Sequence, residues 1–368
     1  MYGVYLMIRF GPAGIPLSCK GRTLKDGIED VHNMSLTAME VQLVRVNTFK
    51  DYPEEDAIGQ TIRTIQDGLV LEIIRDDCVI SDPDEPIEED DELVYLNTGI
   101  VDNFAELGML GDLAKRLDVS LSLHTPNYID LGTNSDLTPV CLNYLRYAGQ
   151  IVNELNGDVV VTSLGLYDGT CSSDEIDDNI VENLGDLVDW WQGAGLKPKI
   201  GIEITGQQDV YGTLDQVLDL CDLFGDAVVP VLDFPHYHSR GCGCLVEPAD
   251  YVNVIDQVLP YCDGKFYARF AGVEHDGEGN ELRLTPIKKG DLVFEKLGDA
   301  LMSNFKRRIV GKDMGDLPTR VKLSDDVANI DGGLVLRVGS VEINSSIETI
   351  FSYLRPRLEA EVARILFP

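Results

Sequence analysis

The strongest constraint in the sequence is a regular alternation of short apolar runs with amphipathic stretches of helical spacing. Eight such pairs follow one another. The apolar runs predict strands at Tyr5–Phe10, Ala38–Val44, Val119–His124, Asp158–Ser163, Lys199–Ile204, Val228–Asp233, Lys265–Phe270 and Leu334–Gly339. Several of them are continuously apolar, as expected of parallel strands that are buried on both faces. Eight strand–helix pairs predict an α/β fold, a (β/α)8 TIM barrel, with a doubly wound open sheet as the alternative.

Two stretches do not fit the eight pairs. Residues 47–101 separate the second strand from its helix and hold two β-rich runs, Gly68–Arg75 and Leu93–Leu96, around an acidic tract. We interpret them as an inserted, hairpin-like subdomain. Residues 311–333 form a second, shorter insertion before the last strand. The prediction is therefore a single barrel domain over 1–368 that carries two insertions.

The charge of the chain limits its partners. Acids outnumber bases 63 to 30, which gives a net charge of -33, and a surface this negative repels phosphate backbones at low salt. The acids are spread along the whole chain, however, and lysine is scarce, with 13 Lys against 17 Arg. This pattern is typical of a protein from a salt-accumulating halophile. In molar salt the Debye length is roughly 3 Å, so net charge says little about partners there.

Cysteine usage and hydropathy indicate the compartment. The eight cysteines lie mostly in apolar segments, which suits reduced thiols. Cys242 and Cys244 are the only close pair, and the second pair or nearby histidine of a zinc finger is missing. Apolar runs stay well below the ~18 residues of a membrane span. We therefore expect a cytoplasmic protein with no membrane partner.

Metal-ligand residue types lie at the carboxyl ends of four predicted strands, where barrel active sites form. They are His124, Glu203, Asp233 and, just after the last strand, Glu342. Glu40, inside the second strand, is a weaker candidate. Several carboxylates buried at one mouth are costly unless a cation or donors compensate them. Carboxylates with imidazole suit zinc, manganese or magnesium.

These segments resemble endonuclease IV-like proteins, which share a superfamily with xylose isomerase-like isomerases and epimerases. The similar segments read Leu-His-Thr-Pro-Asn-Tyr at 123–128, Glu-Ile-Thr-Gly-Gln at 203–207, Asp-Phe-Pro-His at 233–236, Ala-Gly-Val-Glu at 271–274 and Ser-Val-Glu at 340–342. The resemblance implies a hydrolase that cleaves DNA 5′ to an abasic site with three zinc ions. It implies that His124 holds the first ion, that Glu203 bridges two, that Asp233 and Glu342 hold the second, and that His236 holds the third.

The chain departs from that family pattern at four of nine expected ligands. Thr162-Ser163 replaces the histidine after strand four, Arg269 replaces the one after strand seven, and the Asp-x-His pair is missing around Glu281–Leu284. His236 would hold a third ion alone or with help from His238, so we expect fewer than three ions. If Arg269 projects among the strand-end carboxylates, its guanidinium could replace the metal altogether.

Three hypotheses remain open. The first is a metal-dependent, abasic-site endonuclease. The second is a single-metal sugar isomerase or epimerase, in which Glu203, Asp233 and Glu342 shuttle a proton beside a carbonyl. The third is a non-catalytic barrel with Arg269 as its built-in cation. The nuclease hypothesis predicts basic residues around the mouth of the barrel. The candidates are Arg9, Arg45, Arg240, Arg269 and Arg283.

Overall fold

The computed structural model describes residues 9–262, 264–285, 333–338 and 341–346. The chain forms two compact units. We call Met7–Asp233 with Val258–Ala268 the barrel unit, and Phe234–Gln257 with the residues from Arg269 onward the hairpin unit. The predicted second insertion, 311–333, lies outside the described residues except for Gly333.

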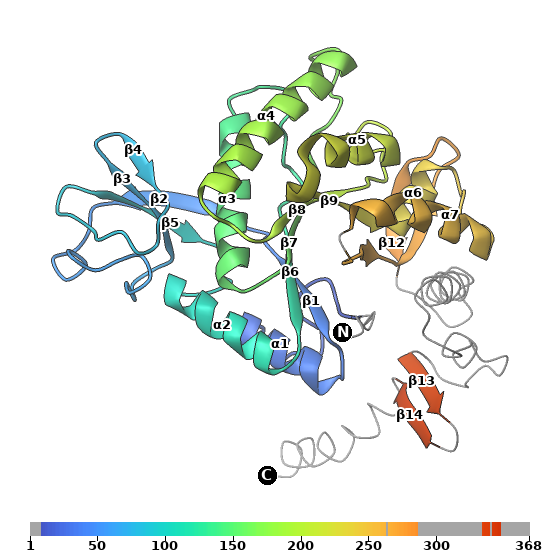
Figure 1. The fold of residues 1–368 in the computed structure, drawn as a ribbon, viewed down its shortest axis with the longest axis horizontal. Coiled ribbons are helices and arrows are strands. Elements are labelled where there is room, and N and C mark those ends of the chain that lie inside the picture. Colours follow the sequence, from blue (N-terminus) through green and yellow to red (C-terminus); the bar gives the residue numbers. More distant parts are fainter. Residues whose placement is uncertain (1–8, 263, 286–332, 339–340, 347–368) are drawn as a thin grey trace, which may run out of the picture. The chain divides into compact units, whose positions relative to one another are not determined.

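A parallel sheet forms the centre of the barrel unit (Figure 1). Its strands follow the order β1-β6-β7-β8-β9-β10, and the pairs from β1 to β9 are in parallel register. They span Ala38–Gln42, Ser120–His124, Val159–Thr162, Lys199–Glu203, Val228–Asp233 and Tyr267–Arg269. These are the predicted strands two to seven. Four valines of β7 and β9, at 159, 161, 229 and 231, form a buried cluster that Tyr267 packs against.

The predicted helices of the barrel unit are present in the expected order: α1 precedes β1, and α2 to α5 follow β1, β6, β7 and β8 in turn. They span Leu24–Asn33 (α1), Phe104–Arg116 (α2), Thr138–Glu154 (α3), Ser173–Gly193 (α4) and Leu214–Phe224 (α5). Side-chain caps explain where four of these five helices begin. Thr23 and Thr213 form capping boxes, and Asn103 and Ser172 each accept a backbone N–H of the first turn. The described helices are not long and apolar enough to span a bilayer.

The insertion at 47–101 is more elaborate than the predicted hairpin. It contains a four-stranded antiparallel sheet in the order β2-β5-β3-β4. In chain order, β2 to β5 span Asn47–Asp51, Val70–Arg75, Cys78–Ile80 and Glu92–Asn97. Two contacts attach the insertion to α3: Tyr147 Oη donates to Glu72 at 3.1 Å, and Arg63 contacts Glu154 at 2.5 Å.

The hairpin unit contains α6 (Phe234–Arg240), most of α7 (Pro248–Val258) and two antiparallel hairpins. The hairpins are β11 (Gly272–His275) with β12 (Glu281–Thr285), and β13 (Gly333–Val338) with β14 (Val341–Ser346). The prediction of an eighth parallel strand at 334–339 is therefore wrong. Its apolar run pairs instead with 341–346, because two residues separate the runs, the spacing of a tight hairpin. Most of the first predicted strand lies outside the described residues.

Candidate metal centre

Three of the predicted ligands end strands of the parallel sheet. His124 is the last residue of β6, Glu203 of β8 and Asp233 of β9. Parallel strands present their carboxyl ends at one edge, so the topology itself gathers these side chains. They are 5%, 6% and 3% exposed. Burial of two carboxylates and an imidazole is costly unless charges or hydrogen bonds compensate it.

The hydrogen bonds of His124 define its tautomer. Its Nδ1 lies 2.5 Å from the carbonyl oxygen of Thr125, which can only accept, so Nδ1 carries the hydrogen. Its Nε2 lies 3.3 Å from Glu203 Oε2. In a neutral ring this places two acceptors face to face. A cation shared by His124 and Glu203 relieves that contact, and this makes the pair fit a metal ion.

Asp233 lies beside Glu203 within the barrel unit. One of its carboxylate oxygens lies within 4.8 Å of one from Glu203. An imidazole nitrogen with two carboxylates is a donor set that zinc or manganese accepts. The residues present therefore fit one divalent ion at the carboxyl ends of β6, β8 and β9.

The end of β7 contributes packing instead of a ligand. Thr162 is fully buried, and its hydroxyl accepts a 2.9 Å hydrogen bond from Thr125 while donating to the carbonyl of Ser163 at 2.7 Å. Both functions of this hydroxyl are thereby used within the protein. At the end of strand four, where the family pattern expects a histidine ligand, the chain therefore has a buried threonine whose hydrogen bonds are made within the protein.

His236 and His238 lie in the hairpin unit, on α6, and have different partners. His236 Nδ1 lies 2.6 Å from Glu281 Oε2, whereas His238 accepts the backbone N–H of Leu245 and packs edge-on against His275. Burial lowers the pKa of His238 below its ordinary value, and the neighbouring His275 lowers it further. One partner of His236 is therefore Glu281, a residue for which the sequence analysis assigned no role.

Arg269 and Glu342 are placed by their strands. Arg269 ends β10, half-buried, two residues beyond Tyr267, so strand alternation gives the two side chains one face of that strand. Glu342 lies in β14, opposite Arg337 in the antiparallel register. Glu342 thus belongs to a hairpin of its own, and its predicted role as a ligand after a parallel strand stays a prediction, as does that of Arg269.

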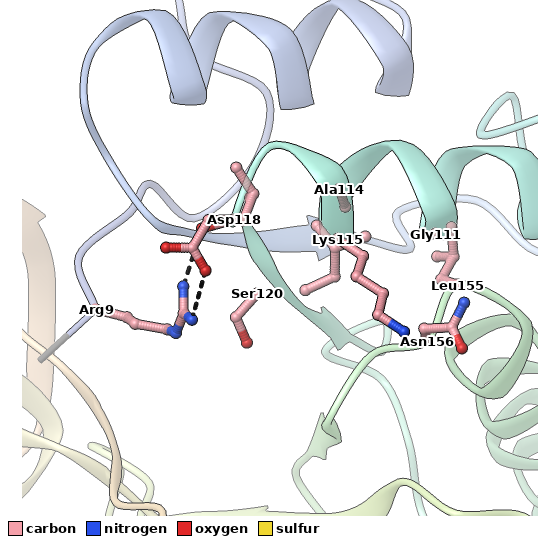
Figure 2. A pocket seen from close by; sticks show the side chains of 10 residues that line it. Arg9, Gly111, Ala114, Lys115, Asp118, Ser120, Leu155 and Asn156 are labelled. Carbon is pink, nitrogen blue, oxygen red and sulfur yellow. Dashed lines mark hydrogen bonds and ion pairs between the residues drawn. The ribbon is translucent and has the colours of Figure 1, made fainter. Parts of the chain in front are cut away.

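Two of the five arginines proposed for a basic mouth have acidic partners elsewhere. Arg9 donates to the side chain and carbonyl of Asp118, at 2.8 and 2.9 Å, beside a cavity of about 300 Å³ at the amino end of β6 (Figure 2). That is the opposite end of the strand from His124. Arg283 contacts Glu274 at 2.6 Å on an exposed hairpin. Both guanidinium groups are thus paired with carboxylates.

Comparisons with known proteins agree with this architecture. Residues 102–305 match the family model described as a xylose isomerase-like TIM barrel. A solved D-tagatose 3-epimerase-like protein is similar with a TM-score of 0.51 and 16% identity, over 81% of this chain and 87% of that one. Endonuclease IV from Thermus thermophilus gives 0.49 and 14%, over 80% and 87%. The family match confirms the predicted barrel fold.

A shorter similarity involves a different kind of protein. A V-type ATP synthase component from Acetivibrio thermocellus is 32% identical to this chain over 87 residues, or 24% of the chain. The chain spans 40% of the length of that curated relative. This match is a local similarity.

Proposed function

The chain belongs to the xylose isomerase-like TIM barrel family, and from that premise we propose that it is an enzyme with one divalent metal ion that isomerises or epimerises a small sugar. The proposal rests on one observation: at strand ends of one sheet, Glu203 lies 3.3 Å from His124 and within 4.8 Å of Asp233. These three side chains would hold the ion, zinc or manganese. When bound, the ion would polarise hydroxyl and carbonyl oxygens of the substrate.

The carboxylates account for the proton transfer. Isomerisation beside a carbonyl requires a base that removes a proton from carbon and an acid that returns it. Each carboxylate has two oxygens, so Glu203 or Asp233 can engage the ion through one and exchange a proton through the other. Their burial removes competing water, which strengthens electrostatic interactions with the substrate.

Two features favour a small substrate over DNA. The buried hydroxyl pair of Thr125 and Thr162 occupies the strand end where a three-metal nuclease needs a ligand. Arg9 and Arg283, two of the groups expected to contact phosphates, are neutralised by Asp118 and Glu274. A phosphodiester substrate needs such cations, because its affinity depends on neutralised phosphates.

Hydrolysis of a DNA phosphodiester at abasic sites is the second candidate. It is favoured by the Asp233-Phe234-Pro235-His236 segment, which resembles the metal-binding element of endonuclease IV-like proteins. The third hypothesis, a non-catalytic barrel, requires Arg269 to replace the ion. We further propose that the protein works in a cytoplasm rich in salt, consistent with its net charge of -33.

The test begins with metal content, measured by elemental mass spectrometry on protein purified in molar KCl without chelators. We expect about one zinc or manganese ion per chain, lost in Glu203→Gln and kept in Glu92→Gln, a control on the exposed Lys50 pair. Ketoses are then incubated with the loaded protein in D2O. Deuterium incorporation beside the carbonyl supports the isomerase, and cleavage of abasic-site DNA without exchange supports the hydrolase. A chain that stays empty when offered both metals contradicts both.

A further inference from the structure

Two cysteines and a histidine that lie far apart in the sequence come together in the hairpin unit. Cys242 and Cys244 flank Gly243 in the turn that follows α6, and both are exposed and free of disulfide bonds. A Cβ on Gly243 would lie 3.5 Å from Nε2 of His275, the last residue of β11. The fold thus places beside this cysteine pair a histidine that the sequence spacing does not predict.

The hydrogen bond of His275 leaves its Nε2 facing the turn as a lone pair. Nδ1 lies 2.8 Å from the carbonyl oxygen of Asp276, which only accepts, so Nδ1 carries the hydrogen of the neutral ring. A histidine that ligates a metal ion commonly donates its other ring N–H to a backbone carbonyl in this way. The ring of His275 is therefore already oriented for an ion on its Gly243 side.

His238 also lies beside the turn but does not suit the same ion. Its Nδ1 accepts the backbone N–H of Leu245 at 3.1 Å, so the hydrogen of the neutral ring is on Nε2. Its ring packs edge-on against that of His275, with the centroids 5.4 Å apart. The role of His238 here is packing, which holds the His275 ring beside the turn.

The two thiols can turn towards a shared ion while the backbone stays in place. Residues 241–243 each donate a backbone N–H to a carbonyl of α6, which fixes the turn. The thiols themselves have only weak partners: Cys242 Sγ lies 3.8 Å from the carbonyl oxygen of Gly277, and Cys244 Sγ lies 3.5 Å from that of Tyr237. Because both side chains are exposed, rotation away from these contacts costs little.

We propose that Cys242, Cys244 and His275 bind one zinc ion, which ties the α6–α7 turn to the β11–β12 hairpin. Two thiolates with one imidazole are a donor set that zinc prefers, and three protein ligands leave the fourth tetrahedral position to water. Each thiol loses its proton to solvent as its sulfur bonds to the ion. This site lies within the hairpin unit and shares no ligand with the candidate metal centre, so it does not depend on the proposed function.

Titration with Co²⁺ tests the thiol ligands. The ion is added to metal-free protein with reduced thiols, because an ion on exposed ligands exchanges with solvent and is lost during purification. Thiolate bound to Co²⁺ gives a near-ultraviolet charge-transfer absorption that carboxylate and imidazole ligands do not give. We expect equal final absorption in native protein, in Glu203→Gln and in Cys78→Ser, a control at another exposed cysteine. We expect none in the double variant Cys242→Ser, Cys244→Ser. No absorption in native protein, or full absorption in the double variant, overturns the proposal.

Affinity and X-ray absorption test the role of His275. Loss of a ligand should exceed the ~10–100-fold cost of losing an outer-shell partner, so we expect Co²⁺ to bind at least about 100-fold more weakly in His275→Gln. Zinc-loaded Glu203→Gln, whose turn is native, should show two sulfur ligands at about 2.3 Å and one nitrogen at about 2.0 Å. Unchanged affinity in His275→Gln, or a zinc shell without sulfur, overturns the proposal. Binding here while the candidate metal centre stays empty supports this site and contradicts the proposed function.

Discussion

At the scale of single residues, the best-defined buried charge lies in the insertion. The side chain of Asp91 is 1% exposed and binds the guanidinium of Arg75 through both oxygens, each at 2.8 Å. Hydrogen bonds from Arg75 hold the pKa of Asp91 below its ordinary range. A lowered carboxyl pKa contributes stability that is present above its ordinary range and is lost as the pH falls through the lowered value.

Removal of Arg75 should therefore destabilise the folded protein strongly. Arg75→Met leaves a buried carboxylate without its cation, and we expect the free energy of unfolding at pH 7 to fall by about 3–5 kcal/mol. Urea denaturation measures the change. Lys50→Met is the control, since Lys50 pairs with Glu92 at the surface and should contribute at most ~1 kcal/mol. Similar losses in the two variants would show that burial of Asp91 does not matter.

For Glu72 we expect stability to depend on pH in the opposite sense to Asp91. Burial raises the pKa of this carboxyl above its ordinary value of 4.5, although the hydroxyl of Tyr147 partly opposes the shift. Because the folded state holds the proton more tightly than the unfolded state, stability is lost as the pH rises through the raised value. Glu72→Gln removes this loss and keeps an acceptor for Tyr147. We expect a higher Tm than native protein at pH 7 and no difference at pH 4; a lower Tm at pH 7 contradicts the argument.

The ligands of the candidate centre and Glu281, which contacts His236 in the hairpin unit, were unequally predictable from sequence. His124, Glu203 and Asp233 could be found because each ends an apolar run, and parallel topology brings such ends together. Glu281 could not be found in this way. Its orientation depends on a register shift that skips Leu282, and no local pattern of charge or hydropathy encodes that shift.

At the scale of elements, helices α3 and α4 lie side by side (Figure 1). They meet at Gly149 of α3. A Cβ on Gly149 would lie 2.5 Å from the indole ring of Trp191, which is itself fixed by a hydrogen bond to the Pro198 carbonyl. The missing side chain therefore sets how closely the two helices approach. Trp191 thus serves packing, because it is buried against α3.

Gly149→Ala should destabilise the protein despite the higher helix propensity of alanine. Overpacking against the Trp191 ring costs about 1–3 kcal/mol, which exceeds the ~1 kcal/mol of propensity gained. Gly193→Ala is the matched control, because Gly193 ends α4 with no heavy atom within 4 Å of its added Cβ. Thermal unfolding should show a lowered Tm for Gly149→Ala and an unchanged Tm for Gly193→Ala. A Tm for Gly149→Ala at or above that of Gly193→Ala would contradict this account.

Element prediction succeeded where periodicity is decided locally and failed where pairing is decided at long range. Strands β6 to β9 were predictable as buried parallel strands, because their apolar runs alternate with amphipathic helices, most of which begin at side-chain caps. The run at 334–339 has a similar apolar composition but pairs with 341–346 in an antiparallel hairpin. An apolar run of six residues does not by itself distinguish the two kinds of partner.

At the scale of the whole molecule, 63 acidic against 30 basic residues set a large electrostatic self-repulsion. This repulsion acts against the compact state and weakens as salt shortens the screening length. Acids also serve as acceptors within the insertion and toward α3, as in the contacts of Arg63 with Asp84 and Glu154. The stability of this chain should therefore depend on salt more than that of a neutral protein of equal size.

The salt response of unfolding distinguishes a halophile from a merely acidic protein. Between 0.05 M and 1 M KCl the Debye length falls from about 14 Å to roughly 3 Å, so screening alone should raise the Tm steeply and then level off. We expect the Tm of this chain to keep rising above 1 M, where screening is nearly complete and added stability must come from ions held in the hydration layer of its carboxylates. Potassium glutamate at matched concentrations separates a need for K⁺ from an effect of chloride, and sucrose controls for exclusion of solutes from the surface. A plateau at 1 M, equal in both salts, would identify simple charge repulsion and remove the argument for a salt-rich cytoplasm.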